Sequence, residues 1–209
     1  MKFLRNTKDH TKWWINREID WNKDYLQTWN HPHRKVLSDI LGRWNWGSLV
    51  EIGCASGPNL VRFAKDHPNK QIGGIDVNPD AIALARQALK GAYLNVSSVE
   101  DIMMSDDSTD IVLTDMALIY VNNPHKAMKE IKRIARNYVV FCELHTKSLW
   151  ARLKLKWSSG YNAHNYHKLL TQYGYEQITA IKITEDMWPG GNPQKDYGYI
   201  YLAKVPKRK

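Results

Sequence analysis

The chain of 209 residues has little of what marks several other classes of protein. Its two cysteines, Cys54 and Cys142, are too few for a disulfide framework or a cysteine metal site, and we expect buried thiols. It has no run of about 18 apolar residues, which excludes insertion into a membrane as a spanning helix. The first residues lack the apolar segment of a secretory signal, so we expect a cytoplasmic location.

Composition bounds what remains. Hydrophobic residues make up 43% of the chain and charged residues 24%, proportions typical of a globular protein. The length suits one compact unit with a sizeable core. Lysine and arginine number 30 against 21 acidic residues, and the net charge of +9 attracts polyanions. A nucleic-acid partner therefore stays open.

The most informative stretch is LVEIGCASGPNL, from Leu49 to Leu60. An apolar run that contains Glu51 breaks into small residues before helical spacing begins, which predicts a strand, a tight loop and a helix N-terminus. Gly53 and Gly57, with Ala55 between them, leave room for a ligand to approach the backbone. We therefore expect this loop to cradle a nucleotide-like cofactor.

The spacing of the loop limits which nucleotide it can hold. A dinucleotide fold needs G-x-G-x-x-G, but here the second glycine position is Ala55 and the third is Pro58, so NAD is disfavoured. A P-loop needs Gly-Lys followed by Ser or Thr, but Gly57 is followed by Pro58 and Asn59, which excludes ATP in that mode.

The remaining pattern, Glu-x-Gly-x-x-x-Gly after a strand, resembles the first motif of class I S-adenosylmethionine-dependent methyltransferases, in which the glycine-rich turn contacts the methionine part of the cofactor. In GGIDVNPDAIALAR, Asp76 ends the next apolar segment, where such enzymes hold the ribose hydroxyls. A carboxylate can accept a hydrogen bond from each hydroxyl.

The resemblance extends to the segment after the third predicted strand, residues 92–96, where the family binds adenine. An acidic residue is usual there, but this chain has Ser98, and Val99 next to it offers a backbone N–H and an apolar wall. The resemblance implies S-adenosylmethionine as cofactor and a binding set of Glu51, Gly53, Ala55, Gly57, Asn59, Asp76, Val77, Ser98, Val99, Thr114 and Asp115.

Alternating strands and helices predict an α/β fold with a doubly wound, Rossmann-like, mostly parallel sheet. The resemblance implies seven strands, with residues 176–184 and 197–204 forming an antiparallel C-terminal hairpin. We expect two N-terminal helices to cap the cofactor site, with residues 1–46 as this cap and residues 47–209 as the methyltransferase domain.

The first of these helices is predicted over residues 13–29, with an apolar stripe that includes Trp14 and Trp21. Glu18 and Asn22 lie inside this stripe, where burial costs free energy unless each finds a partner. We consider them candidates for contact with substrate, although bonds within the protein are the alternative. Tyr120 and His164 are outer candidates.

Methyl transfer from a sulfonium mainly requires that the acceptor be positioned and water excluded. An acceptor that must lose a proton benefits from a general base. His145, directly after the predicted strand 138–144, is the first candidate, followed by Asp115 and Glu143. We expect no metal, because no specific ligand spacing is present.

These features predict an S-adenosylmethionine-dependent methyltransferase that acts on a small polar acceptor, by O- or N-methylation of a sugar or amine metabolite. An RNA methyltransferase is the first alternative. A non-catalytic partner subunit that retains the cofactor fold is the second. The oligomeric state stays open.

Overall fold

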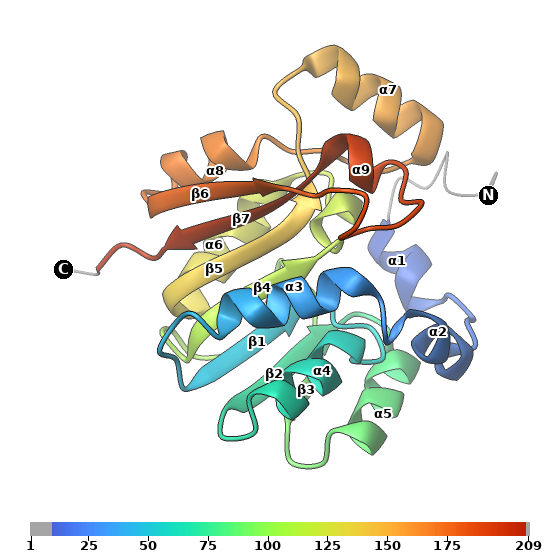
Figure 1. Ribbon diagram of the computed structural model, residues 1–209, viewed down its shortest axis with the longest axis vertical. Helices are drawn as coiled ribbons and strands as arrows, with labels where there is room; N and C mark the ends of the chain where they lie inside the picture. The colour runs from blue at the N-terminus through green and yellow to red at the C-terminus, as the bar shows by residue number, and fades with distance from the viewer. Residues whose placement is uncertain (1–9, 208–209) are drawn as a thin grey trace.

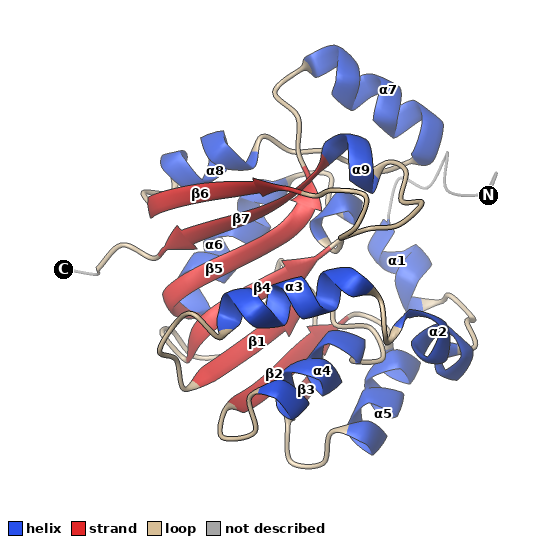
Figure 2. Cartoon of the chain, in the orientation of Figure 1, coloured by secondary structure: helices blue, strands red, loops and turns tan. Residues whose placement is uncertain are grey.

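The computed structural model describes residues 10–207, which form a twisted sheet between two layers of helices (Figures 1 and 2). The seven strands run in the order β3-β2-β1-β4-β5-β7-β6 across the sheet. Their bounds are β1 Ser48–Ile52, β2 Gln71–Asp76, β3 Tyr93–Val96, β4 Thr109–Asp115, β5 Ala135–Leu144, β6 Glu176–Lys182 and β7 Gly198–Lys204.

The strand pairing confirms the predicted fold class. The pairs from β3 to β5 are all parallel, whereas β7 runs antiparallel to both β5 and β6. The helices are α1 His10–Ile15, α2 Trp21–Thr28, α3 Pro32–Leu41, α4 Pro58–Asp66, α5 Pro79–Ala88, the 3-10 helix η2 Leu118–Tyr120, α6 Pro124–Ile134, α7 Leu149–Ser159, α8 Tyr166–Gln172 and α9 Gln194–Tyr197.

The core lies on both faces of the sheet, because successive side chains of a strand point to opposite sides. In β4, Ile111 and Leu113 join one buried cluster with side chains of α3, α4 and α5. Val112, between them, joins the other cluster with side chains of α6 and α8. A strand buried on both faces explains the continuous apolar run in the sequence.

The prediction of one continuous helix over residues 13–29 is wrong, because the structure has two helices there, α1 and α2. With α3, three helices precede β1. The break follows from a cap: the Asp20 carboxylate accepts a hydrogen bond from the Lys23 backbone N–H at 3.0 Å. Asp20 starts a new helix, so the apolar stripe inferred for one continuous helix does not exist.

Two further features position the site. The N-cap residue Asn78 starts α5 by accepting a hydrogen bond from Ala81 N at 3.0 Å, directly after β2. Helix α7 stands clear of the sheet in Figure 1, at one corner of the molecule. No helix within residues 10–207 has the length and apolar character that crossing a membrane requires.

Candidate functional site

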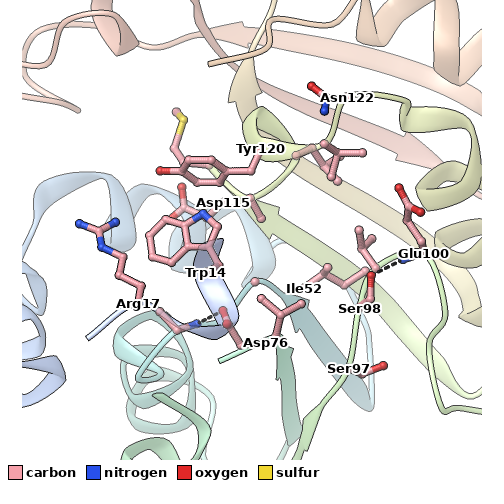
Figure 3. A pocket seen from close by; sticks show the side chains of 18 of the residues that line it. Trp14, Arg17, Ile52, Asp76, Ser97, Ser98, Glu100, Asp115, Tyr120 and Asn122 are labelled. Atoms are coloured by element: carbon pink, nitrogen blue, oxygen red, sulfur yellow. Dashed lines mark hydrogen bonds between the residues drawn. The ribbon is translucent and has the colours of Figure 1, made fainter. Parts of the chain in front are cut away.

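A cavity of about 520 Å³ lies where the carboxyl ends of β1, β2, β3 and β4 meet (Figure 3). Ile52 and Asp76 line it from the ends of β1 and β2, Ser98 from the segment after β3, and Asp115 from the end of β4. The order of strands reverses between β1 and β4, and open α/β sheets bind ligands at such a switch point. The volume is within the range of small-molecule sites, about 300 to 1,000 Å³.

The loop after β1 is held tightly against its neighbours. Gly53 has φ +73° and Gly57 has φ +83°, a region that favours glycine. A Cβ on Gly53 would lie 2.4 Å from the Cβ of Ala117. Ala117 therefore fills the space that a Cβ on Gly53 would take, whereas Gly53 itself lines the cavity. A Cβ on Gly57 would instead meet Ala85 of α5, at 3.3 Å.

Asp76 connects this loop to β2. One carboxylate oxygen accepts a hydrogen bond from Ala55 N and the other from Asn78 N, both at 2.9 Å. Burial raises the pKa of Asp76, and these backbone donors oppose the shift. Each oxygen retains a lone pair that can accept a second hydrogen bond, so the carboxylate is able to receive a pair of ligand hydroxyls.

Asp115 is surrounded by the Arg34 cation and by hydrogen-bond donors from α3 and α4. Its Oδ2 accepts hydrogen bonds from His33 Nε2 at 2.8 Å and Asn59 Nδ2 at 2.9 Å, and Arg34 Nη1 is 3.8 Å away. Burial alone would raise the pKa of Asp115, but His33 and Arg34 outweigh it and hold the pKa well below its usual value. Asp115 is thus a carboxylate at the cavity floor that stays ionised.

The second oxygen of Asp115 is the feature that points to a ligand. Oδ1 is buried and has no hydrogen-bond partner within residues 10–207. The Cys142 thiol, a weak donor, lies beside the same carboxylate. A buried charged oxygen without a strong partner costs free energy, and a cationic ligand group would remove that cost.

Beneath the floor, Asn59 links three ionisable side chains. Its Nδ2 donates to Glu51 Oε1 at 2.6 Å as well as to Asp115, and its Oδ1 accepts from Arg34 Nη1 at 2.6 Å. Burial and the nearby Asp115 raise the pKa of Glu51 to about 8. Glu51 and Asn59 therefore lie under the cavity and orient Asp115, rather than lining it; Gly57 and Thr114 also lie outside the lining.

The far side of the cavity is formed by the segment after β3. Val77, Ser98 and Val99 line it, as do Gly53 and Ala55 from the loop after β1. The Ser98 hydroxyl accepts a hydrogen bond from Glu100 N at 3.2 Å (Figure 3). This bond leaves the hydroxyl proton available to a ligand acceptor and a lone pair available to a donor.

An aromatic wall closes the opposite end. The rings of Trp14 and Tyr120 meet edge to face with centroids 4.9 Å apart, and Trp14 also lies 6.4 Å from Trp21. The Arg17 guanidinium lies over the Trp14 ring at 4.7 Å. Burial and the neighbouring Tyr161 raise the pKa of Tyr120, so its hydroxyl is protonated at neutral pH.

The first candidate base, His145, is placed outside this cavity. Its Nδ1 accepts a hydrogen bond from Tyr166 N at 3.2 Å and lies 3.2 Å from the Tyr201 hydroxyl. Burial lowers the pKa of His145 to about 4. Glu143 is also outside the lining: its Oε1 accepts from the backbone N–H groups of Ala117 and Leu118, both at 3.0 Å. Both side chains therefore hold backbone in place.

The candidate substrate residues divide in the same way. Tyr120 lines the cavity, as described above. His164 is buried, and its Nε2 donates to the carbonyl of Val121 at 2.9 Å, outside the lining. Glu18 and Asn22 are exposed and also outside the lining. Placing the last two in a buried stripe is wrong, because the helix that would have buried them is interrupted at Asp20.

Sequence reasoning missed His33 and Arg34, which set the charge state of Asp115. Both are polar residues in the first turn of an amphipathic helix, where polarity alone does not indicate burial, but the structure buries both. It also missed Arg17, Glu100 and Asn122 in the cavity lining. No group of three or more His, Cys, Asp or Glu side chains is arranged to hold a metal ion in the described part of the chain.

Comparison with known proteins places this geometry in context. Residues 50–142 match the family model of a methyltransferase domain. An uncharacterized methyltransferase of Schizosaccharomyces pombe is 23% identical over 99 residues, covering 42% of this chain and 36% of the relative.

Solved structures share the fold. A methyltransferase from Thermotoga maritima, described as a possible histamine N-methyltransferase, has a TM-score of 0.66 at 17% identity over 88% of this chain and 95% of its own. Geranyl diphosphate C-methyltransferase from Streptomyces coelicolor, in complex with S-adenosyl-L-homocysteine, has a TM-score of 0.65 at 13% identity over 82% and 76%.

The chain spans 31% to 48% of the length of the curated relatives that it matches. The matched segment nevertheless contains the loop after β1, Asp76, Ser98 and Asp115, which together surround the cavity. Residues 50–142 therefore match a methyltransferase domain, and the chain has the fold of solved S-adenosylmethionine-dependent methyltransferases.

Proposed function

We propose that this chain transfers a methyl group from S-adenosylmethionine to a nitrogen atom of a small molecule. The observation that carries the proposal is the buried Asp115 carboxylate at the cavity floor, whose Oδ1 has no strong hydrogen-bond donor within residues 10–207, only the weak donor Cys142 beside the carboxylate. It faces the same cavity as Asp76, the carboxylate that ends β2. A ligand with an ammonium group at one end and a diol farther along matches this pair of acceptors.

The residues present fit the cofactor. Asp115 would receive the ammonium group of its methionine part, and Asp76 would receive the ribose hydroxyls. Ser98 and Val99 would contact the adenine ring through a hydroxyl, a backbone N–H and an apolar side chain. When bound, the cofactor supplies a sulfonium-linked methyl group, which an acceptor lone pair displaces in line. The protein positions the acceptor and excludes water.

Nitrogen is favoured over oxygen because no histidine lines the cavity within the described residues and the carboxylate at its floor is a weak base. Its acidic and basic lining residues are Arg17, Asp24, Asp76, Glu100, Asp115 and Tyr120, with no histidine among the described ones. Asp115 is a weak base because its pKa is depressed, and Tyr120 is protonated. A hydroxyl acceptor needs a general base, whereas a neutral aromatic nitrogen already carries its lone pair.

The wall of Trp14 and Tyr120 suits such an acceptor. Aromatic faces attract the positive charge that a nitrogen acquires when it is methylated, which stabilises the developing product. The Trp14 side chain comes from α1, so residues before β1 complete the acceptor end of the cavity. This enclosure favours a small molecule over RNA.

Two measurements test the proposal. Calorimetric titration with S-adenosylmethionine should show binding, and folded protein that does not bind would indicate a non-catalytic partner subunit. Transfer of labelled methyl is then measured with three acceptor sets: imidazole and aromatic amines, sugars, and bulk RNA. Histamine is a suitable first probe because its imidazole nitrogen is neutral near pH 7.

We expect labelled product in the amine set, at a rate that changes little with moderate salt. The matched variant Trp14→Ala should lower transfer while largely retaining cofactor affinity, because Trp14 lies at the acceptor end. Label in RNA that falls steeply with salt would overturn the proposal, since that dependence marks phosphate contacts. Label in sugars alone would overturn the choice of nitrogen.

A further inference from the structure

Helix α7 exposes an apolar face that the methyltransferase site does not use. Trp150 and Trp157 are each 82% exposed, Leu149 is 64% exposed and Leu153 is 54% exposed. Solvent exposure on this scale is unusual for four large apolar side chains on one short helix, and contiguous apolar patches mark interaction sites. We propose that α7 docks on an anionic lipid surface.

The four side chains form one face rather than a scatter. At 100° per residue they occupy a stripe about 100° wide on the helix. Leu155, on the opposite side, is buried and packs in a cluster with Ile119, Leu144 and Ala163. Because Leu155 already anchors α7 to the body of the protein, the outward stripe is not needed to hold the helix in place.

The charges around the stripe identify the partner. Residues 147–159 contain four cations, Lys147, Arg152, Lys154 and Lys156, and no acidic residue. Lys154 is exposed on the helix beside the stripe, and Lys147 is exposed two residues before the helix begins. Apolar side chains bordered by cations are typical of helices that lie in the membrane interface, with tryptophan at the headgroup level and lysine toward lipid phosphates. An anionic bilayer supplies both the apolar layer and the negative charge.

The position of α7 gives such docking a consequence for the site. Lys156 Nζ donates to Asn122 Oδ1 at 2.8 Å, and Asn122 lines the cavity. Tyr161, just after the helix, meets the cavity residue Tyr120 with ring centroids 5.7 Å apart. A membrane that held α7 would therefore lie close to the acceptor end of the cavity. The docking goes beyond the proposed reaction and does not depend on it.

Vesicle flotation with the full chain tests the proposal. The vesicles contain phosphatidylcholine, with or without about one third phosphatidylserine. We expect partition of the protein only into the anionic vesicles, weakened when salt rises from about 0.1 M to 0.5 M. The double variant Trp150→Ala/Trp157→Ala should reduce partition about tenfold or more. Its fold should be unchanged, because both side chains are exposed.

A second variant tests the contribution of the lysine charges to membrane binding, and a matched control tests whether the apolar contribution is specific to α7. Lys147→Gln/Lys154→Gln should reduce partition by about 25-fold, because each of the two cations near an anionic surface contributes roughly a factor of five. Met103→Ala removes a side chain that is 71% exposed outside α7 and should leave partition unchanged.

Three outcomes would overturn the proposal: no partition of the wild type into anionic vesicles, equal partition of the wild type and the tryptophan variant, or binding of α7 to RNA in place of vesicles. A dimer in sedimentation that the tryptophan variant abolishes, without vesicle binding, would assign the face to a second copy of the chain.

Discussion

The carboxyl ends of β4 and β5 lie side by side in the sheet, and each carries a buried carboxylate, yet the two sites differ in chemistry. Asp115, on β4, faces His33 and Arg34 and remains ionised, with a pKa below its usual value. Glu143, on β5, lacks such cations, and burial raises its pKa to about 8. The position of a carboxylate at a strand end therefore does not decide whether it is ionised. The side chains of the helices packed against it do.

The largest effect is expected from removing the charge at β4. Asp115→Asn leaves Arg34 and His33 without their anion and removes the acceptor that we assign to the cofactor ammonium. We expect S-adenosylmethionine affinity to fall at least about 100-fold, because a charged hydrogen bond is lost. Thermal unfolding should show a loss on the order of 3 kcal/mol, since one member of a buried ion pair is removed.

Asp39→Asn is the matched control for Asp115, because Asp39 pairs with Lys35 at the surface, where its side chain is 54% exposed. Exposed pairs contribute little, so the control should stay within about 1 kcal/mol of the wild type in stability and keep full cofactor affinity. Equal stability and equal cofactor affinity of the two variants would show that Asp115 contributes no more than a surface carboxylate.

Asp76→Ala should have the second-largest effect on binding. We expect cofactor affinity to fall by about 1.5–3 kcal/mol, because two ligand hydroxyls lose a charged acceptor. The Ala55 and Asn78 backbone donors would also lose their partner. Asp80→Ala, at an exposed position in the first turn of α5, is the control and should bind normally in calorimetry. Unchanged affinity for Asp76→Ala would remove the ribose assignment.

Gly53→Ala and Gly91→Ala separate backbone strain from steric conflict. Both glycines have positive φ, and alanine in this region costs roughly 1–2 kcal/mol. Only Gly53 also faces a neighbour, Ala117, whereas a Cβ on Gly91 would meet nothing within 4 Å. We expect the Gly53 variant to be less stable than the Gly91 variant and to bind cofactor more weakly. Equal melting temperatures would show that Ala117 yields easily.

The sequence predicted the site residues whose positions follow from the order of strands and helices along the chain. Asp76 follows the glycine loop by one helix and one strand, so its place at the sheet edge comes from chain order alone. His33, by contrast, meets Asp115 across 82 positions, and no spacing rule connects them. Asp20 is a signal that the sequence does contain, because aspartate before a helical segment is a common N-cap. It indicates that a new helix begins after it, which divides the single helix predicted over residues 13–29.

The raised pKa of Glu143 leads to a gradual effect, seen in the pH dependence of stability. As pH rises from about 4.5, the unfolded state releases this proton while the folded state retains it until about pH 8. Stability should therefore fall over this window, by at most roughly 1.4 kcal/mol per pH unit. Glu143→Gln should flatten the decline in denaturant titrations. The raised pKa of Glu51 would leave a residual slope. If stability fell with pH equally in the wild type and the Glu143→Gln variant, Glu143 would be ionised in the folded state.

The smallest effect on catalysis is expected at His145, which also lies at the end of β5. Its ring accepts from Tyr166 N and lies outside the cavity, so it should serve as a backbone support rather than a base. Asparagine can accept the same hydrogen bond through its side-chain oxygen, and His145→Asn should change the turnover rate by less than about threefold while lowering stability by about 1 kcal/mol. Loss of a true general base would reduce the rate by about 10² to 10⁴ and would flatten its pH profile. Steady-state rates between pH 5 and 9 distinguish these results, because a structural role affects the melting temperature and a catalytic role affects the profile.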